Sequence, residues 1–584
     1  MYEDLIDASL GKIPVDLLIK NGQMLNVHTR ETYEANVGVY KDRIVYVGPE
    51  EPTTDGHTKI IDAKGLILIP GFIDAHIHIE SSMMAYTQFA KAVLPHGTTA
   101  VITDLHEVGI VLGLKGIRYV LDEAKKTPVK AFWKVPSHIP FAPGMETTGA
   151  IVGPEDIKEA LTWEEAVGLA EVIVPSIVQK NPDLLKAVGY TIAESKILEG
   201  HAPATRGRNL VAYSIIGVRS DHESTTAEEA LEKLRVGIDI MIREGSVSHD
   251  LKGVIKLITE YKMSTHRCML VTDDETPIDV ANLGHMDYKI RYAISEGVDP
   301  IDAIQMATIN PARHFNIDHL VGSISPGRYA DIVAVSSLDK IDIKFVVANG
   351  ELYVEDGKLV KDIPLPDYPD WLTNTINVGR ELTEADFDIK HSKEKGTAKV
   401  RVIGVKDGTL LKDALEAELP IVNYKIQVDP EKDILKIAVI ERHKATGNIG
   451  LGFVSGFGLK EGAIGTTVAH DNHNISIVGT NNRDMMVAAN HLIKIRGGMV
   501  VVKDGKILGD LPLPIAGLMS PEPCEKVKEM LENLHKLASD LGCKLTSPFM
   551  TLAFTILPAI PAYGITDMGL VDVFQFKLVS PIIS

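Results

Sequence analysis

The sequence predicts an α/β protein built on a TIM-like (β/α)8 barrel, with a composite small β domain from both flanks and an additional C-terminal α/β domain. Three observations predict this class. Apolar strand-like runs alternate with helical stretches over residues 65–327. Short alternating strands precede and follow that region. A Pro-rich acidic segment, PLPDYPDW at residues 364–371, separates it from a second β/α region.

These sequence patterns set the expected domain boundaries. We expect the composite β domain to comprise residues 1–64 and 328–366, the (β/α)8 barrel residues 65–327, and the C-terminal α/β domain residues 367–584. The total of 584 residues suits two to four domains.

The elements follow from local patterns. Residues 16–62 alternate apolar and polar, with turn signals at Asn21-Gly22 and Lys41-Asp42. Residues 225–245 are typical of a helical stretch. The strands of the barrel are expected in apolar runs: LILIPGFIDAHIHIE, TTAVITDLH, GLAEVIVP, LVAYSIIGV and RCMLVTDD. Strands return after Gly327 in ADIVAVSSL and IKFVVANGELYVEDGKLV.

Composition excludes several functional classes. The chain has 45% apolar and 24% charged residues, as ordinary globular proteins do, and a net charge of −19 that repels nucleic acid and anionic lipid. The three cysteines are too scattered for a disulfide framework or a C-x-x-C zinc site: Cys268, Cys524 and Cys543. Neither a signal peptide nor a bilayer-spanning run is evident. We therefore expect a cytoplasmic protein without membrane or nucleic-acid partners.

The strongest chemical signal is the segment from Asp74 to Glu80, DAHIHIE. Strict strand alternation would turn Ile73, Ala75, Ile77 and Ile79 toward the helices, and the intervening polar residues into the barrel mouth. The polar set is Asp74, His76, His78 and Glu80. Two imidazoles two residues apart on one strand can bind the same cation. The alternative is a solvated edge strand, but the almost wholly apolar run before it favours a buried one.

Further candidates end other predicted strands, in the order Glu171, His201, His222, Asp273 and Asp274. Taken singly, each has an ordinary explanation as a surface carboxylate, a loop histidine or a helix N-cap. Barrel enzymes, however, hold their active sites at the C-terminal ends of the strands. The order of these residues therefore predicts one shared metal site, with Asp221 and Glu223 flanking and orienting His222.

At this point a family resemblance is clear. PGFIDAHIHIESS, the order of strand-end residues and NPARHFNIDHLVGSISPGRYADIVAV resemble the metal-dependent amidohydrolase superfamily. Within it, IESSMM, TDLHE, GHAP, RSDHES, VTDD and the C-terminal VAHDNHNISIVGTNNRDMMVAANHLI resemble the adenine deaminases. The resemblance spans nearly the whole chain. It implies hydrolytic deamination of adenine to hypoxanthine and ammonia by a metal-activated hydroxide, in purine salvage, by a homo-oligomer (a dimer or larger).

The resemblance also implies roles for individual residues. His76 and His78 would hold one metal, completed by Asp273, while His201 and His222 hold the second. Glu171 would bridge the pair with its two oxygens. The implied centre is binuclear Mn²⁺ or Fe²⁺, with Zn²⁺ as the alternative, because imidazole and carboxylate ligands suit all three.

Catalysis is assigned to Asp273, as the group that moves a proton from the hydroxide to the leaving amine, and to Glu107, as the donor to the ring or the partner of the substrate's edge. Taken alone, Glu107 could equally be a charged loop residue, and the HDNHN segment an Asn/Asp-rich turn. The residues expected to bind the substrate are Asp104, His106, Ser81, Asp274, His470 and His473. His138 departs from the family pattern, which has a small residue or cysteine there.

Two other functions remain open. A related amidohydrolase that cleaves a cyclic amide or an N-acetyl group would usually carry a bridging lysine and lack TDLHE. A catalytically silent barrel scaffold would have lost ligands, whereas every expected position is filled here. The unrelated zinc nucleobase deaminases need H-x-E with P-C-x-x-C, which three dispersed cysteines exclude.

Overall fold

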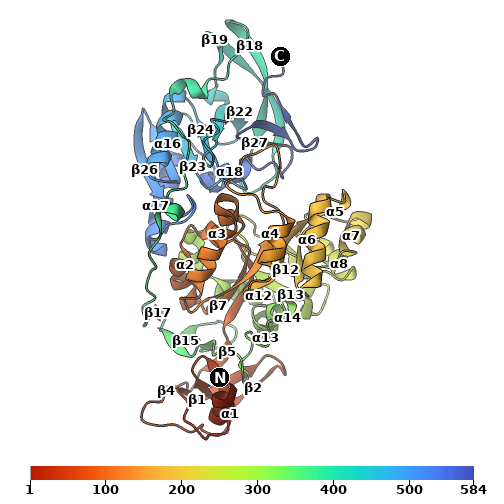
Figure 1. Cartoon of the computed structure of the whole chain (residues 1–584), viewed down its shortest axis with the longest axis vertical. Helices are drawn as coiled ribbons and strands as arrows, with labels where there is room; N and C mark the ends of the chain where they lie inside the picture. The colour runs from red at the N-terminus through yellow and green to blue at the C-terminus, as the bar shows by residue number, and fades with distance from the viewer. Residues whose placement is uncertain (1) are drawn as a thin grey trace.

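The computed structural model describes residues 2–584 and divides them into three parts stacked along the long axis, with the barrel in the middle (Figure 1). At one end lies a sheet ordered β17-β16-β15-β14-β5-β1-β2-β3, with β4 paired to β1. Its strands from the N-terminal flank are β1 (Leu17–Asn26), β2 (Glu31–Tyr40), β3 (Arg43–Gly48), β4 (Lys59–Asp62) and β5 (Ile67–Pro70), preceded by helix α1 (Tyr2–Ser9). Those from the far side of the barrel are β14 (Ile332–Val335), β15 (Ile343–Ala348), β16 (Glu351–Glu355) and β17 (Lys358–Leu359). The two flanks join where β5 pairs antiparallel with β14, so the predicted composite sheet is present.

One predicted turn in this sheet is wrong. Asn21-Gly22 does not reverse the chain but lies inside β1, where the pairing register with β2 shifts between Ile19 and Gly22. Asn21 has a φ of 62°, a left-handed conformation that asparagine tolerates, so the pair forms a bulge within one strand. The predicted turn at Lys41-Asp42 does connect β2 to β3.

The barrel consists of eight parallel strands in sequential order, β6 to β13. They are β6 (Phe72–Ile77), β7 (Thr98–Thr103), β8 (Lys130–Pro136), β9 (Ala166–Ile173), β10 (Ile197–His201), β11 (Val218–Asp221), β12 (Asp239–Arg243) and β13 (Cys268–Val271). The ring closes between its first and last strands: the N–H of His78 donates to the carbonyl of Asp273, and the N–H of Asp273 to the carbonyl of His76, each at 3.0 Å. The predicted TIM-like barrel is confirmed.

The interior of the barrel corrects the predicted faces of β6. Ile73 and Ala75 share a buried cluster with Met241 and Met269, and that cluster takes apolar side chains from nearly every strand of the ring. Such a cluster can only lie inside the barrel. The register of β6 with β7 shifts between Asp74 and Ile77. Because of this irregularity strict alternation fails, and Ile73 and Ala75 point inward together with His76.

Asp74 is also displaced from its predicted place at the barrel mouth. Its Oδ2 accepts a hydrogen bond from the hydroxyl of Thr272 at 2.5 Å and lies 3.4 Å from His285 Nε2. His285 in turn packs edge-on against Phe89 of the surrounding helix layer. Burial raises the pKa of Asp74 to about 6. Asp74 therefore ties the first strand of the barrel to the residue that follows the last strand, and it does not reach the predicted metal site.

The helices around the barrel follow the strands, as expected of β/α units. They are α2 (Tyr86–Val93), α3 (His106–Ala124), α4 (Pro154–Ala160), α5 (Val174–Val178), α6 (Pro182–Ala193), α7 (Gly207–Ser214), α8 (Ala227–Arg235), α9 (Leu251–Val254), α10 (Lys256–Thr259), α11 (Pro277–Leu283), α12 (Met286–Ser295), α13 (Pro300–Met306) and α14 (Ile309–His314). Helix α8 shows why they form: the Thr226 side chain caps its first turn, and acidic residues begin it while basic residues end it.

Two predicted elements are wrong in this region. Most of LVAYSIIGV lies in α7, and the strand β11 begins only at Val218. The stretch 225–245 is not one helix, because α8 ends at Arg235, Gly237 has a φ of 90°, and β12 begins at Asp239. Glycine takes this left-handed conformation without penalty, so it allows the sharp change from helix to strand.

The C-terminal part is built on a nine-stranded sheet ordered β20-β19-β18-β22-β21-β24-β23-β25-β26. Its strands are β18 (Lys395–Gly404), β19 (Asp413–Val422), β20 (Lys425–Ile426), β21 (Leu435–Ile440), β22 (Ile449–Ser455), β23 (Ala463–Thr466), β24 (Ile475–Gly479), β25 (Gly498–Lys503) and β26 (Lys506–Pro512). A small sheet, β27 (Tyr563–Thr566), β28 (Gly569–Asp572) and β29 (Lys577–Val579), and helices α15 (Asp370–Thr373), α16 (Asn482–Lys494), α17 (Cys524–Asp540) and α18 (Pro548–Thr555) complete it. Figure 1 shows this part above α3 and α4, and the backbone of Ser520 bonds to Met83 and Ala85 of the barrel. Within residues 2–584, no helix is both long and apolar enough to cross a bilayer.

Candidate metal centre

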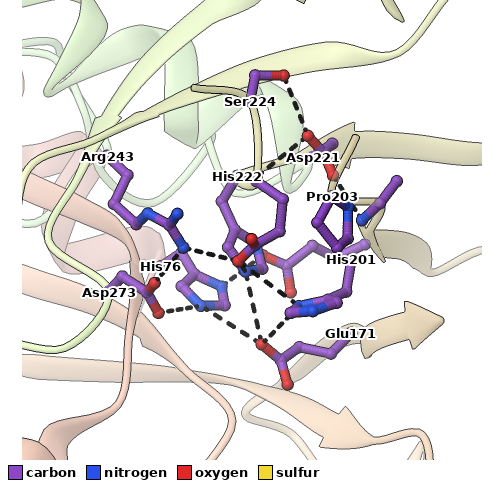
Figure 2. Close-up of polar contacts among 12 residues, drawn as sticks. His76, Glu171, His201, Pro203, Asp221, His222, Ser224, Arg243 and Asp273 are labelled. Carbon is purple, nitrogen blue, oxygen red and sulfur yellow. Dashed lines mark hydrogen bonds and ion pairs between the residues drawn. The ribbon is translucent and has the colours of Figure 1, made fainter. Parts of the chain in front are cut away.

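Four histidines and two carboxylates converge at the C-terminal ends of the barrel strands. Figure 2 labels all of them except His78. They come from five strands or the residues directly after them, and they are the six residues that the sequence predicts as ligands: His76, His78, Glu171, His201, His222 and Asp273. His76 and His222 stack with their ring centroids 4.0 Å apart. The structure therefore brings together residues that are spread over about two hundred positions of the chain.

Glu171 lies at the centre of this cluster. Its Oε1 is 3.5 Å from His222 Nε2, 3.6 Å from both His78 Nε2 and His201 Nδ1, and 4.0 Å from His76 Nε2. Its other oxygen instead faces His106, whose Nδ1 is 3.9 Å from Oε2. One oxygen thus faces all four imidazoles, which differs from the expected arrangement with one oxygen for each metal.

Asp273 closes one side of the cluster. Its Oδ1 lies 3.2 Å from His76 Nε2 and 3.3 Å from His78 Nε2. Its Oδ2 accepts a hydrogen bond of 2.8 Å from Arg243 Nη1, a contact visible in Figure 2. The same guanidinium group pairs with Glu223 at 2.6 Å, and Glu223 lies 3.3 Å from His222 Nε2. Arg243 at the end of β12 therefore orients a carboxylate on each side of the cluster, a role that the sequence analysis did not assign.

The residues fit a divalent metal. Among the described residues, the buried atoms His76 Nε2 and His201 Nδ1 have no hydrogen-bond partner although both face Glu171. A buried polar atom without a partner costs free energy, so a ligand of positive charge is the expected occupant of the space between them. Neutral imidazole with carboxylate is a donor set for Zn, Mn or Fe.

Charge within the cluster is strongly coupled. Burial alone would raise the pKa of Glu171, but the adjacent His201 and His78 imidazoles hold it well below its usual range. Burial would lower the pKa of His76, yet the nearby Glu199 carboxylate raises it to about 9. The carboxylates of the site therefore favour the protonated form of the nearby imidazoles, and the imidazoles favour the ionised form of the carboxylates.

Two residues of the site were missed in the sequence, Lys134 of β8 and Glu199 of β10. Both are fully buried, and Lys134 Nζ lies 2.6 Å from Glu199 Oε2. The other oxygen of Glu199 is 2.6 Å from His76 Nδ1 and 3.8 Å from His222 Nδ1. The Glu199 carboxylate thus contacts the Nδ1 atoms of two imidazoles of the cluster, His76 and His222. The available signal was a charged residue within an otherwise apolar strand, two positions before His201.

Three of the expected substrate-binding residues have partners within the protein. Asp104 Oδ1 lies 3.1 Å from His78 Nδ1, on the side of the ring away from Glu171. Such a contact fixes the tautomer of a metal-binding imidazole. Ser81 donates a hydrogen bond to Asp274. Burial and the Asp273 charge raise the pKa of Asp274.

The C-terminal domain reaches this site through the loop between β23 and β24. His470 Nδ1 lies 3.0 Å from Glu107 Oε1, and His473 contacts the other oxygen of Glu107. The His470 ring stacks on Phe554 of α18 at 4.6 Å, which fixes its orientation. Although burial raises it, His470 and His473 hold the pKa of Glu107 well below its usual range. The pKa of Glu107 therefore depends on residues more than 360 positions away in the sequence.

His106 and His138 lie beside Glu171, between the barrel strands and the C-terminal domain. The His106 ring meets the His138 ring edge-on at 5.4 Å, and the His138 ring meets Phe141 at the same distance. Burial and the neighbouring His106 lower the pKa of His138 to about 3. His138 is therefore a neutral imidazole at the edge of the cluster.

Comparison with known proteins agrees with this architecture. The chain matches the Amidohydrolase family over residues 67–353, and the family described as Adenine deaminase C-terminal domain over residues 409–577. An eight-stranded parallel barrel with a buried histidine–carboxylate cluster and the first of these matches defines a metal-dependent amidohydrolase.

Similarity to individual proteins identifies the family of this chain more closely. A protein of Clostridium botulinum (strain 657 / Type Ba4) named adenine deaminase is 45% identical over 582 residues, covering 99% of this chain and 96% of that protein. An adenine deaminase of Moorella thermoacetica is 42% identical, covering 99% and 97%. Adenine deaminase 3 of Rhizobium meliloti is 40% identical, covering 98% and 97%. The chain belongs to the adenine deaminase family.

Proposed function

We propose that this protein hydrolyses adenine to hypoxanthine and ammonia. The observation that carries the proposal is the 45% identity to an adenine deaminase along 99% of the chain. That similarity includes the C-terminal domain, whose His470 and His473 contact Glu107. An amidohydrolase barrel alone would be compatible with many substrates. The shared second domain, which reaches the active site, narrows the proposal to adenine.

We assign the metal ligands as follows. His76, His78 and Asp273 would hold one divalent ion, His201 and His222 the other, and Glu171 lies between the two sets. Mn²⁺ or Fe²⁺ is the proposed pair, with Zn²⁺ as the alternative, because each accepts imidazole and carboxylate ligands. When bound, such ions lower the pKa of coordinated water to about 7 and so supply hydroxide at neutral pH.

The protein side chains would manage the protons. Replacing the 6-amino group by oxygen consumes one water, which leaves its oxygen on C6 and gives its hydrogens to the departing amine and the ring. Asp273 is a carboxylate at rest, because the adjacent His76 and His78 imidazoles and the charge of Arg243 hold its pKa well below the usual range despite burial. It can therefore accept a proton and pass it to the leaving ammonia.

Glu107 would deliver the proton to the ring nitrogen. Burial lowers the pKa of His470, but the Glu107 carboxylate raises it to about 9, so at neutral pH the proton resides on His470. Glu107, 3.0 Å from His470 Nδ1, can relay that proton to a substrate in the site. Asp104 would hold the His78 ring in its orientation, and Ser81, Asp274 and His473 would line the substrate site.

The test is turnover by protein loaded with Mn²⁺, Fe²⁺ or Zn²⁺ in turn. Adenine should yield hypoxanthine and ammonia in equal amounts. Turnover of a dihydropyrimidine with none of adenine would instead support hydrolysis of a cyclic amide. Comparing the three metals identifies the one that supports the highest kcat.

The bridging role of Glu171 has its own test. Glu171→Ala should bind much less metal than the unmodified protein after dialysis, because its Oε1 is the atom that four imidazoles approach. Metal content is measured by mass spectrometry of the digested protein. A full complement of ions in this variant would contradict the assignment.

The setting of the reaction is also a proposal. All three cysteines are free and buried, which suits a reducing cytoplasm. We further propose a homo-oligomer, dimer or larger, from the family relationship. Light scattering on the purified protein tests the oligomeric state.

A further inference from the structure

Three side chains that the deamination does not use for its two metals form a second cluster, which we call the rim cluster. It consists of His106 at the start of α3, His138 in the loop after β8, and Asp471 in the loop between β23 and β24. One potential ligand atom from each of the three lies within 4.8 Å of those of the other two. Two of these residues come from the barrel and the third from the C-terminal domain.

Hydrogen bonding fixes the proton on His138. The Ser137 hydroxyl donates its single hydrogen to the carbonyl of Glu171 at 3.0 Å. Ser137 Oγ also lies 2.7 Å from His138 Nδ1, so in this second hydrogen bond it must be the acceptor. The neutral His138 ring therefore carries its proton on Nδ1. Its Nε2 is left with a free lone pair.

His106 offers a second unused nitrogen. The residue is only 3% exposed, and its Nε2 has no hydrogen-bond partner within residues 2–584. Its Nδ1 points instead toward Glu171 Oε2, at 3.9 Å. A buried imidazole nitrogen left unpaired costs free energy, so the position calls for a ligand.

Asp471 adds a negative charge to the two imidazoles. Its neighbours with opposite charge are histidines, His106 and His470, and no lysine or arginine of the described residues forms an ion pair with it. The Asp471 carboxylate and the two imidazoles together offer three ligand atoms for a cation.

We propose that His106, His138 and Asp471 form a third divalent-cation site, separate from the two-metal cluster around Glu171. Two imidazoles and one carboxylate are the protein ligands of many four-coordinate zinc sites and also suit Mn²⁺ and Fe²⁺. This role replaces the substrate contact expected for His106. An ion here links the ends of β7 and β8 to the C-terminal domain and so fastens that domain over the barrel mouth.

The proposal does not depend on which substrate the enzyme uses, because it concerns bound metal only. The test uses the full-length protein, stripped of metal with a chelator and titrated with Zn²⁺ or, in parallel, Mn²⁺. Bound ions are counted by mass spectrometry after dialysis against a defined free-metal concentration. The unmodified protein should bind three ions per chain.

Variants separate the two sites. His138→Ala and the nearly isosteric Asp471→Asn should each bind two ions, with affinity for the third weakened by more than about 100-fold, since even supporting partners of a ligand cost 10- to 100-fold. Glu171→Ala should lose metal from the central cluster and still retain one ion. His535→Ala is the matched control, because that half-buried histidine stacks on Phe549 outside the rim cluster, and it should keep three.

Thermal unfolding provides a second measurement on the same proteins. In the unmodified protein and in His535→Ala, occupying the third site should raise the Tm above its value with two ions bound. In His138→Ala and Asp471→Asn, the same increase in metal concentration should leave the Tm unchanged.

Two results would overturn the proposal. One is a limit of two ions per chain in the unmodified protein at saturating metal. The other is a count in His138→Ala and Asp471→Asn equal to that of the unmodified protein, with a raised KM for adenine. That second pattern would make the rim cluster part of the substrate pocket.

Discussion

Replacing Glu199 by glutamine is the sharpest test of how the metal cluster is held. Glu199 is fully buried and its two oxygens contact different partners, Lys134 Nζ at 2.6 Å and His76 Nδ1 at 2.6 Å. Lys134 Nζ and His76 Nδ1 are themselves only 2.5 Å apart. Glu199→Gln keeps the size of the side chain but removes the negative charge that contacts both Lys134 and His76.

The magnitude follows from burial. Removing one partner of a buried ion pair leaves an uncompensated charge and costs about 3–5 kcal/mol of stability. Glutamine also offers one acceptor oxygen where the carboxylate offers two, so the orientation of His76 weakens. Losing the group that orients a metal-binding histidine costs about 10- to 100-fold in metal affinity. We expect both losses in this variant.

Chemical unfolding of the metal-free protein measures the first loss and metal titration the second. The double variant Lys134→Met/Glu199→Gln separates them. It removes the uncompensated charge, so stability should recover, while His76 still lacks its carboxylate and metal affinity stays low. Unchanged stability and unchanged metal affinity in Glu199→Gln would refute the reasoning. Recovery of both in the double variant would show that Glu199 serves only to neutralise Lys134.

Three further predictions follow from the structure. Asp273→Asn should lower kcat for adenine by about 10²- to 10⁴-fold, the usual contribution of a proton-transferring group, and steady-state assays measure it. His473→Ala removes one of the two histidines that lower the pKa of Glu107, so the acidic limb of kcat/KM against pH should move to higher pH; an unmoved limb would contradict this. Away from the site, burial raises the pKa of Glu165, but hydrogen bonds from Arg118 and Lys125 lower it to about 2, from 4.5 when unfolded. Its stabilising effect is therefore present above pH 4.5 and lost as pH falls toward 2. Glu165→Gln should cost about 1 kcal/mol at pH 7, because Lys125 is half exposed, and flatten the stability profile between pH 5 and 2.

The convergence of the proposed metal ligands could be predicted because the barrel is a repeating fold. Each strand ends at the same rim, so His201 after one apolar run and Asp273 after another are expected to meet, whatever their separation in the chain. The composite sheet was predictable for a similar reason, since short alternating strands flank the barrel on both sides. These inferences need only local patterns and one topological rule.

The details that failed depend on single residues that break a pattern. The faces of β6 could not be predicted because a register shift between Asp74 and Ile77 turns Ala75 and His76 inward together. The left-handed Gly237 separates a helix from a strand in the middle of the segment predicted as one helical stretch. A bulge or a left-handed glycine changes direction at one position, and the hydrophobic period on either side does not record it.

Contacts between distant segments were beyond local patterns for another reason. Lys134 lies in FWKVP and Glu199 in ILEGH, and nothing near either residue indicates the other. The same holds for Glu107 and His473, which belong to different domains. For such pairs only burial reveals the partner, because a charged group in the interior must be compensated wherever the partner lies in sequence.

That requirement also singles out Glu171. Three other carboxylates that contact the cluster have a lysine or arginine: Asp273 and Glu223 share Arg243, and Glu199 has Lys134. Asp104 has a histidine alone, but it contacts His78 through Nδ1, the nitrogen that faces away from Glu171. Glu171 has ion-pair contacts with histidines alone. Imidazoles that bind a metal are neutral, so they cannot also balance this carboxylate. Under the proposed assignment, the charge that compensates Glu171 would come from the metal ions, and for that reason Glu171, rather than a carboxylate nearby that already has a lysine or arginine, is the one suited to lie between them.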